Sequence, residues 1–315
     1  MRGTLRLGAL ALTALIALAA CGTSGASSAP TASAAPPASV AASEAPSVAP
    51  SVDACARENL ALIAPGKLTV GTDNPAYPPY FAPKDGGNTA PWDPAQGDPN
   101  SGKGFESAVA YAVAKQLGFA PTDVSWVVVP FANSFAPGPK TFDFDINQIG
   151  FKPERAQTAD LTDGYYFGNQ SIVALKSNPV AKATTIAELA NATLGAQVGT
   201  TSYDAIVNTI KPTKEAKVFD SNDAAIQALK TKAIDAIVVD LPTADFLANV
   251  EIENSTIVGQ LDQGTPERFS LALTKDSKLT ACLNQAIGAL TTDGTLKGLA
   301  DQYLPFTTGT PVLKP

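Results

Sequence analysis

Apolar and polar residues follow two periods along most of this chain, one typical of strands and the other of helices. Short runs rich in β-branched residues, such as 67–73 and 234–240, have the length and composition of strands. Residues 104–118 (GFESAVAYAVAKQLG) place apolar side chains at helical spacing and end at Gly118, a typical helix C-terminus. Strands and helices of this kind alternate over most of the chain, and this order predicts an α/β fold.

The alternating elements fall into two series. Strands at 124–129 and 142–149 belong to the first series, and a strand at 170–176 begins the second. The two series join near 170–176 and again near 262–270. About 260 residues suffice for two lobes of ordinary size. Two crossing connections between such lobes form a natural hinge.

The first residues differ from this pattern. Residues 1–20 combine a basic start, Arg2 and Arg6, with an apolar stretch that is too short to span a membrane. They are therefore predicted to be an export signal. Leu-Ala-Ala-Cys at 18–21 resembles the lipobox of bacterial lipoproteins, which implies that Cys21 is lipidated. The alternative is a plain secretory signal with an incidental cysteine.

Residues 21–53 consist almost entirely of Ser, Ala, Pro, Val and Thr. Such a composition cannot bury enough apolar surface to form a core. We therefore expect a disordered tether between the signal and the globular part.

Composition excludes several classes of function. The formal net charge is −7, and removal of the signal's two arginines makes it −9. With no Lys/Arg-rich run, nucleic acid is not expected as a partner. The chain has no His and no CxxC motif, so we expect neither a zinc site nor a cofactor. Cys55 and Cys282 remain as a pair for an oxidising compartment, and a disulfide is favoured over two separate thiols.

Arg155 occupies a position where an anion could bind. It follows the strand-like stretch that ends at Gly150, and Pro153 and Glu154 are residues suited to a helix start. Ligand crevices of α/β sheets lie where a strand's carboxyl end meets a helix. The alternative is an ordinary surface or salt-bridged arginine.

Six motifs arrive in an order that carries a family resemblance: GKLTVGTDNPAYPPY, GFESAVAYAVAKQLG, PERAQTADLTDGYY, GAQVGTTSYDAI, AIQALKTKAIDAIVVD and LTTDGTLKGLADQYL. Together they resemble the extracytoplasmic solute-binding proteins of polar amino-acid ABC transporters, over roughly residues 60–305. The resemblance implies a two-lobed, type II periplasmic-binding-protein-like fold that closes on a free amino acid. Lobe one would comprise 54–172 and 268–315, and lobe two 173–267.

The resemblance also implies roles for residues that match the family motifs. Arg155 would grip the ligand's α-carboxylate with paired, charge-assisted hydrogen bonds. Thr200 and Thr201, with nearby backbone N–H groups, would hold the same carboxylate from lobe two. Asp240 would accept the α-ammonium group. For the two threonines and for Asp240, a role as a helix N-cap is the alternative.

Three further positions of lobe one match residues that surround a ligand in this family. Tyr77 and Phe131 match aromatic positions that sandwich the ligand's side chain. For Phe131, simple core packing is the alternative. Asp73 follows the first strand and matches a position that often senses ligand polarity.

Some residues depart from the family pattern. Gln148 and Gly150 stand where relatives commonly carry small hydroxyl residues, and Lys152 stands where a threonine is usual. An insertion rich in Pro, Gly and Asn occupies 84–103. Gln148 and Gln170 could hydrogen-bond an amide or hydroxyl, which favours a ligand with a polar, uncharged side chain.

The sequence thus predicts a monomeric, lipid-anchored binding protein on the extracytoplasmic face of the membrane. It would pass a free amino acid to an ABC permease and perform no bond chemistry. A periplasmic dehydratase acting on prephenate-like acids is one alternative, because the same fold resembles such enzymes. The other is a ligand sensor for a separate membrane receptor.

Overall fold

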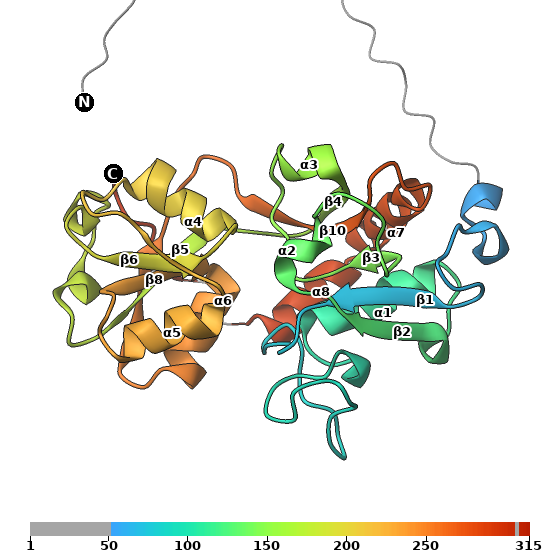
Figure 1. Ribbon diagram of the computed structural model, residues 1–315, viewed down its shortest axis with the longest axis horizontal. Helices are drawn as coiled ribbons and strands as arrows, with labels where there is room; N and C mark the ends of the chain where they lie inside the picture. Colours follow the sequence, from blue (N-terminus) through green and yellow to red (C-terminus); the bar gives the residue numbers. More distant parts are fainter. Residues whose placement is uncertain (1–51, 306–308) are drawn as a thin grey trace, which may run out of the picture. The chain divides into compact units, whose positions relative to one another are not determined.

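The computed structural model describes residues 52–305 and 309–315, whose strands form two sheets (Figure 1). The sheets have the strand orders β2-β1-β3-β10-β4 and β7-β6-β8-β5-β9. The strands are β1 (Leu68–Thr72), β2 (Val124–Val128), β3 (Phe144–Asp145), β4 (Ala159–Gly168), β5 (Gln170–Leu175), β6 (Leu194–Gln197), β7 (Lys217–Phe219), β8 (Ala236–Asp240), β9 (Ser255–Gln260) and β10 (Glu267–Thr274). The α-helices are α1 (Phe105–Gln116), α2 (Phe131–Ser134), α3 (Arg155–Thr158), α4 (Thr201–Ala205), α5 (Asn222–Lys230), α6 (Leu241–Phe246), α7 (Thr280–Thr292) and α8 (Thr295–Tyr303).

Lobe one is defined here as the first sheet with α1, α2, α3, α7 and α8. Its strand β1 runs parallel to β2 and β3, whereas β10 runs antiparallel to β3 and β4. The core of this lobe joins apolar residues of the sheet, such as Val70, to Val113 of α1 and Leu283 of α7. The amphipathic pattern of 104–118 thus becomes a helix whose apolar face packs on the sheet.

Lobe two is defined as the second sheet with α4, α5 and α6. Alternate residues of its central strands enter two different cores: Ile172 and Val238 pack on the side of α4, and Val173 and Val239 on the side of α5 and α6 (Figure 1). Because both faces of the sheet are covered, the central strand reads as a continuous apolar run in the sequence. The two-lobed α/β fold predicted from the sequence is confirmed.

The chain passes between the lobes from β4 to β5 and again from β9 to β10, and the bounds of the lobes differ from those expected. Strand β5 begins at Gln170, so residues 170–172 belong to the second sheet and not to lobe one. Residues 309–315 were also expected in lobe one. Instead Val312 bridges Gln260 of β9, and the buried Leu313 enters the core of lobe two. An edge strand offers unpaired backbone groups, and here the tail supplies their partners.

Some expected elements are shorter than predicted. The strand expected over 142–149 contains only β3, because the chain turns at Gln148, which has a φ of 46°. The helix expected to start at Pro153 starts at Arg155. Thr185 and Glu188 exchange the two hydrogen bonds of a capping box, but the segment that follows is a single 3₁₀ turn, Ala187–Leu189.

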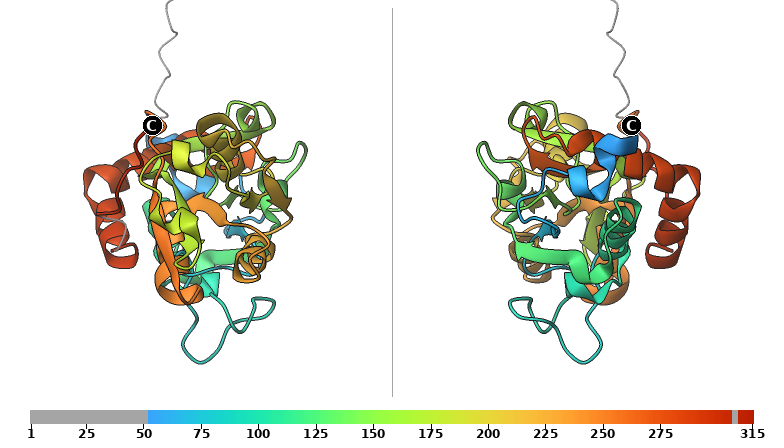
Figure 2. Two further views of the ribbon diagram at one scale, coloured as in Figure 1. Left: turned by 90° about the vertical axis from the view of Figure 1, so that its left-hand side faces the viewer. Right: turned by 90° about the vertical axis from the view of Figure 1, so that its right-hand side faces the viewer.

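Two features lie at the margin of lobe one. Cys55 and Cys282 of α7 are joined by a disulfide with a Cα–Cα distance of 5.4 Å, so the pairing favoured from the sequence is present in the structure. Most of the insertion at 84–103 forms a loop that extends away from the sheets (Figure 2). None of the helices formed by residues 52–305 and 309–315 has the length and apolar character needed to cross a membrane.

Candidate ligand-binding site

A cavity of about 450 Å³ is lined by residues of both lobes. Most of the predicted ligand-binding residues line it: Asp73, Tyr77, Phe131, Gln148, Thr200, Thr201 and Asp240. Among the residues that the structure describes, its lining does not include Arg155 or Gly150. The structure therefore brings most of the predicted set together around one space.

The topology explains why these residues meet. Asp73 follows β1 and Phe131 follows β2, and both strands run parallel. In lobe two, Thr201 follows β6 and Asp240 ends β8, which is parallel to β6. Carboxyl ends of parallel strands lie at the same sheet edge, where ligand crevices form. Each lobe thus presents such an edge to the cavity.

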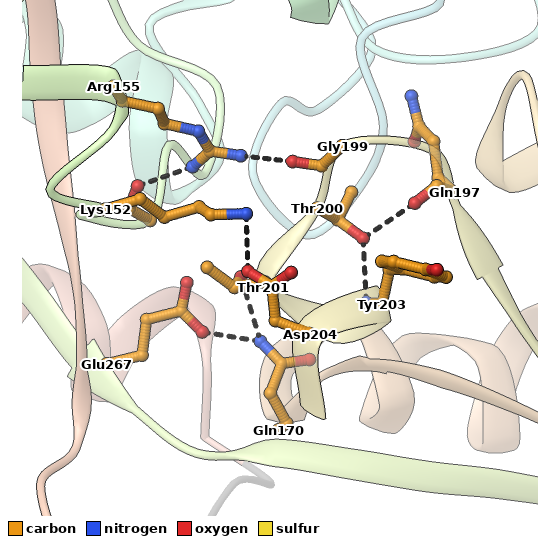
Figure 3. Close-up of polar contacts among 11 residues, drawn as sticks. Lys152, Arg155, Gln170, Gln197, Gly199, Thr200, Thr201, Tyr203, Asp204 and Glu267 are labelled. Atoms are coloured by element: carbon orange, nitrogen blue, oxygen red, sulfur yellow. Dashed lines mark hydrogen bonds and ion pairs between the residues drawn. The ribbon is translucent and has the colours of Figure 1, made fainter. Parts of the chain in front are cut away.

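Arg155 is buried and bridges the two lobes (Figure 3). Its guanidinium donates to the carbonyl oxygen of Gly150 in lobe one and, at 2.7 Å, to that of Gly199 in lobe two. The guanidinium carbon also lies 4.3 Å from the ring centre of Phe135, a cation–π contact. Burial lowers the pKa of Arg155 to about 10, so the side chain stays cationic at neutral pH.

Thr200 caps its own helix, which was the alternative to a ligand-binding role in the sequence analysis. Its hydroxyl oxygen accepts from the backbone N–H of Tyr203 at 3.2 Å and the hydroxyl donates to the carbonyl of Gln197. The hydroxyl oxygen of Thr201 lies 3.4 Å from Nε2 of Gln170. Because Thr200 is committed to the helix start, Thr201 is the hydroxyl better placed for a ligand.

Asp240 makes no side-chain capping bond to the helix that follows it. Its Oδ1 accepts instead from Nε2 of Gln170 at 2.7 Å, and the same nitrogen donates to Oε2 of Glu267 at 2.5 Å. Burial raises the pKa of Asp240 well above its usual range, and the nearby charge of Glu267 raises it further. Burial also raises the pKa of Glu267, whereas contacts with Thr201, Gln170 and Arg155 act to lower it.

The sequence did not identify Glu267 as a site residue. Glu267 begins β10, at the second crossing between the lobes. In the sequence, the only signal was its place in the crossing expected near 262–270, which by itself assigns no role to a carboxylate. Its partner Gln170 begins β5, at the first crossing.

The cavity is acidic. Asp73, Asp220, Asp223 and Asp240 line it, and within the described part of the chain its lining contains no Lys or Arg. Burial raises the pKa of Asp73 and that of Tyr77, whose hydroxyl hydrogen-bonds the Asp223 side chain of the other lobe. The arrangement can therefore hold cations better than anions.

Gln148 is already engaged within lobe one. Its backbone N–H donates to Oε1 of Glu106 at 2.7 Å, and its side-chain amide donates to Oε2 of the same carboxylate. The Tyr165 hydroxyl is a third donor to Glu106, whose burial raises its pKa to about 7. One N–H of the Gln148 side-chain amide is thus occupied, which leaves its second N–H and its carbonyl oxygen for a ligand.

Other contacts also join the lobes. Lys152 pairs with Asp204 of lobe two, and the hydroxyls of Tyr80 and Thr243 lie 3.0 Å apart (Figure 3 shows the lysine).

Among residues 52–305 and 309–315, no group of three or more acidic, Cys or His side chains is arranged to hold a metal ion. The site is built from protein groups that recognise charge and hydrogen bonding.

Comparisons with known proteins find related sequences. The sequence profile of the bacterial extracellular solute-binding proteins, family 3, matches residues 68–306. The chain is 30% identical over 208 residues to the "Probable histidine-binding protein" of Campylobacter jejuni, a match covering 64% of this chain and 76% of that protein.

Solved structures give the same fold. The arginine-, lysine-, histidine-binding protein ArtJ of Geobacillus stearothermophilus superposes with a TM-score of 0.61 at 22% identity, covering 76% of this chain and 95% of ArtJ. An ancestral amino acid-binding protein that preceded cyclohexadienyl dehydratase has a TM-score of 0.59 at 25% identity, covering 76% of this chain and 95% of its own.

Proposed function

Because the chain belongs to the bacterial extracellular solute-binding proteins of family 3, we propose that it captures a free amino acid between its lobes and passes it to an ABC permease. The observation that carries this proposal is the shared cavity. Lobe one contributes Asp73 and Phe131 to its lining, and lobe two contributes Thr201 and Asp240. A ligand that contacts both lobes favours their closed arrangement.

The two ends of the amino acid have separate partners in this proposal. Asp240 accepts the α-ammonium group from the end of β8. Arg155 and Thr201 hold the α-carboxylate. A guanidinium has five N–H donors, and two hydrogen bonds to backbone carbonyls leave others for a ligand. Opening of the lobes breaks the bond to Gly199 and gives the carboxylate access to Arg155.

We propose a cationic side chain for the ligand, in place of the uncharged one favoured from the sequence. Support comes from the acidic lining, in which Asp220 and Asp223 face the cavity together with Asp73. Aromatic faces of Tyr77 and Phe131 suit an alkyl or guanidinium group. A curated relative named as histidine-binding agrees with a basic ligand.

The proposed cellular setting is the extracytoplasmic face of the membrane, with a lipid on Cys21. Residues 1–51 lie outside the described part of the chain, so this part of the proposal rests on the sequence 18–21. Replacing Cys21 by Ser is expected to move the mature protein out of the membrane fraction. A variant that is cleaved but stays membrane-bound would contradict the anchor. We propose a monomer as the working unit.

The dehydratase alternative has a specific observation in its favour, the similarity to the ancestral protein that preceded such an enzyme. That ancestor is itself named as amino acid-binding, which supports binding rather than catalysis here. Turnover of prephenate by the purified protein would favour the alternative.

Isothermal titration calorimetry tests the main proposal. Protein freed of carried-over ligand by partial unfolding and dialysis is titrated with each of the twenty common amino acids. Arginine, lysine or histidine is expected to bind more tightly than glutamine or asparagine. If all twenty fail to bind, the proposal is wrong. Tighter binding of an uncharged amino acid contradicts only the proposed side chain.

A further inference from the structure

The carboxylate of Glu267 occupies the space beside Gly150. A Cβ atom on Gly150 would lie only 1.8 Å from Oε1 of Glu267, so a larger residue at this position would require the end of the Glu267 side chain to move. Backbone pairing explains the contact: Gly150 bridges Phe269 of β10, so the loop after β3 lies against the first residues of that strand. Glu267 therefore fills the position where the family pattern has a hydroxyl side chain.

Glu267 and Asp240 form an acid pair that shares one donor. Nε2 of Gln170 lies 2.7 Å from Oδ1 of Asp240 and 2.5 Å from Oε2 of Glu267 (Figure 3 shows the bond to Glu267). Both carboxylates are thus within hydrogen-bond distance of one nitrogen. Gln170 starts β5 and Glu267 starts β10, so the pair sits where the chain crosses between the lobes.

Two acceptor atoms of this cluster lack a donor. In the described part of the chain, Oε1 of Glu267 and Oε1 of Gln170 are buried and have no hydrogen-bond partner. Buried acceptors without donors are costly, and each calls for an explanation. An ammonium group brings three N–H donors and a positive charge to such a cluster. Asp240 lines the cavity in front of it, where a ligand can arrive.

We infer that Glu267 is the second acid of the ammonium site: it acts on the ligand's ammonium group from behind Asp240, and the pair gives up a shared proton when that group binds. The inference rests on the proposed function. Glu267 is a positioning residue in this arrangement. It acts on the site through its hydrogen bond with Gln170 and through the effect of its charge on Asp240.

The surroundings of Glu267 combine both signs of charge. Arg155 faces it from lobe one and favours its ionised form, whereas Asp204 of lobe two opposes ionisation. Asp204 is itself paired with Lys152, so its own charge is largely balanced. Thr201 supplies a hydroxyl on the same side.

The surroundings of Asp240 are mostly acidic or neutral. Beyond Glu267, the buried Glu106 of α1 opposes its ionisation, and Gln170 is the amide that favours it. The Tyr80 hydroxyl, bonded to Thr243, is a further titratable group nearby, and its own pKa is raised first by burial and then by the charge of Asp240. The positive charge of Arg155 also interacts with this carboxylate.

Proton release follows from this arrangement. Two carboxylates this close lose their protons in two steps, because the first charge makes the second ionisation harder. Burial raises the pKa of both carboxyls, and the charge of Glu267 raises that of Asp240 further, so in this proposal the cluster holds a proton in the absence of ligand. A ligand ammonium placed at Asp240 removes the repulsion, so the proton leaves as the cation binds.

Calorimetry in two buffers of different ionisation enthalpy measures this proton directly. The wild-type protein is titrated with the tightest-binding amino acid between about pH 5.5 and pH 8. We expect a release that approaches about one proton in part of this range. Glu267→Gln should release no proton and bind at least about tenfold more weakly, with a flatter pH profile. Glu215→Gln removes the same charge at an exposed position of lobe two and should behave as the wild type.

The outcomes separate this inference from the proposed function. If the wild type binds an amino acid and Glu267→Gln keeps both its affinity and its proton release, the inference is wrong while the proposed function stands. Tighter binding by Glu267→Gln would also overturn it, because Glu267 would then compete with the ligand's carboxylate for Arg155. If the wild type binds none of the twenty amino acids, both proposals fail together.

Discussion

The guanidinium of Arg155 in lobe one donates a hydrogen bond of 2.7 Å to the carbonyl oxygen of Gly199 in lobe two. The same side chain that is proposed to grip the ligand therefore also connects the two lobes. Gly199 precedes the helix start at Thr200 and Thr201, so the contact places the arginine beside the lobe-two part of the site. One residue thus contributes to the contact between the lobes and, in the proposed function, to ligand binding.

Replacing Arg155 by Ala should weaken amino-acid binding by about 30-fold or more, since losing one partner of a desolvated charge pair typically costs about 2–5 kcal/mol. Arg155→Lys should restore little of this affinity, because an ammonium cannot make the paired bonds of a guanidinium. Calorimetry measures both variants, and circular dichroism checks that they are folded. Wild-type affinity in Arg155→Ala would contradict the carboxylate role.

Asp240→Asn should weaken binding of an amino acid by a similar factor, because the amide cannot balance the α-ammonium charge. The matched test uses a ligand that lacks its α-amino group. This ligand should bind the wild type poorly and should lose little further affinity in Asp240→Asn. If the variant weakens both ligands equally, Asp240 acts on the fold rather than on the ammonium group.

Most residues of the candidate site were expected because they match family motifs, and the fold explains why these residues meet. A strand that ends in Asp240 and a strand that leads to Thr201 are parallel neighbours, so their ends had to meet. The amphipathic pattern of α1 and the apolar run of β8 likewise defined their elements. Local periodicity predicted these elements, whereas the expected roles of the site residues came from the family resemblance.

Other parts could not be predicted because they depend on contacts between distant segments. Glu267 became a site residue through its approach to Gly150 and Gln170, more than ninety residues away in the sequence. Leu313 belongs to lobe two because the C-terminal residues pair with the edge strand β9. The sequence of these C-terminal residues does not indicate that pairing. Neither contact leaves a periodic signal in the chain.

Glu106 should make folding stability depend on pH. Its pKa rises from 4.5 to about 7 in the folded protein, so the folded state binds this proton more tightly than the unfolded chain does. Its contribution therefore lowers the free energy of unfolding as pH rises from about 4.5 to about 7, by up to roughly 3 kcal/mol.

Urea unfolding at about pH 5 and about pH 8 measures this decrease in the free energy of unfolding. In Glu106→Gln the decrease in stability between the two pH values should be smaller than in the wild type, whatever the variant's absolute stability. The exposed substitution Glu215→Gln should leave the decrease unchanged. An unchanged decrease in Glu106→Gln would show that this carboxyl does not titrate in the window.

Leu313 should anchor the C-terminal residues to lobe two. Its side chain is 3% exposed and packs so closely on Gly259 that a Cβ there would lie 2.8 Å from it. Leu313→Ala is expected to lower the free energy of unfolding by about 2–4 kcal/mol, as burial losses of this kind do. Val312, which is 50% exposed, supplies the control: Val312→Ala should change stability by less than about 0.5 kcal/mol. Equal effects of the two substitutions would contradict the docking of the tail.

The bond between Cys55 and Cys282 should stabilise lobe one by restricting the unfolded chain. The two residues are 227 apart in the sequence, and the loop-entropy model gives about 5 kcal/mol as an upper bound for a loop of this length. The double variant Cys55→Ala/Cys282→Ala should therefore unfold at a lower urea concentration than the oxidised protein. Reduced wild-type protein should unfold at the same urea concentration as the double variant, because both lack the cross-link. Labelling of the soluble part of the chain, denatured without reductant, should find no free thiol at these positions, and two labelled cysteines would contradict the bridge.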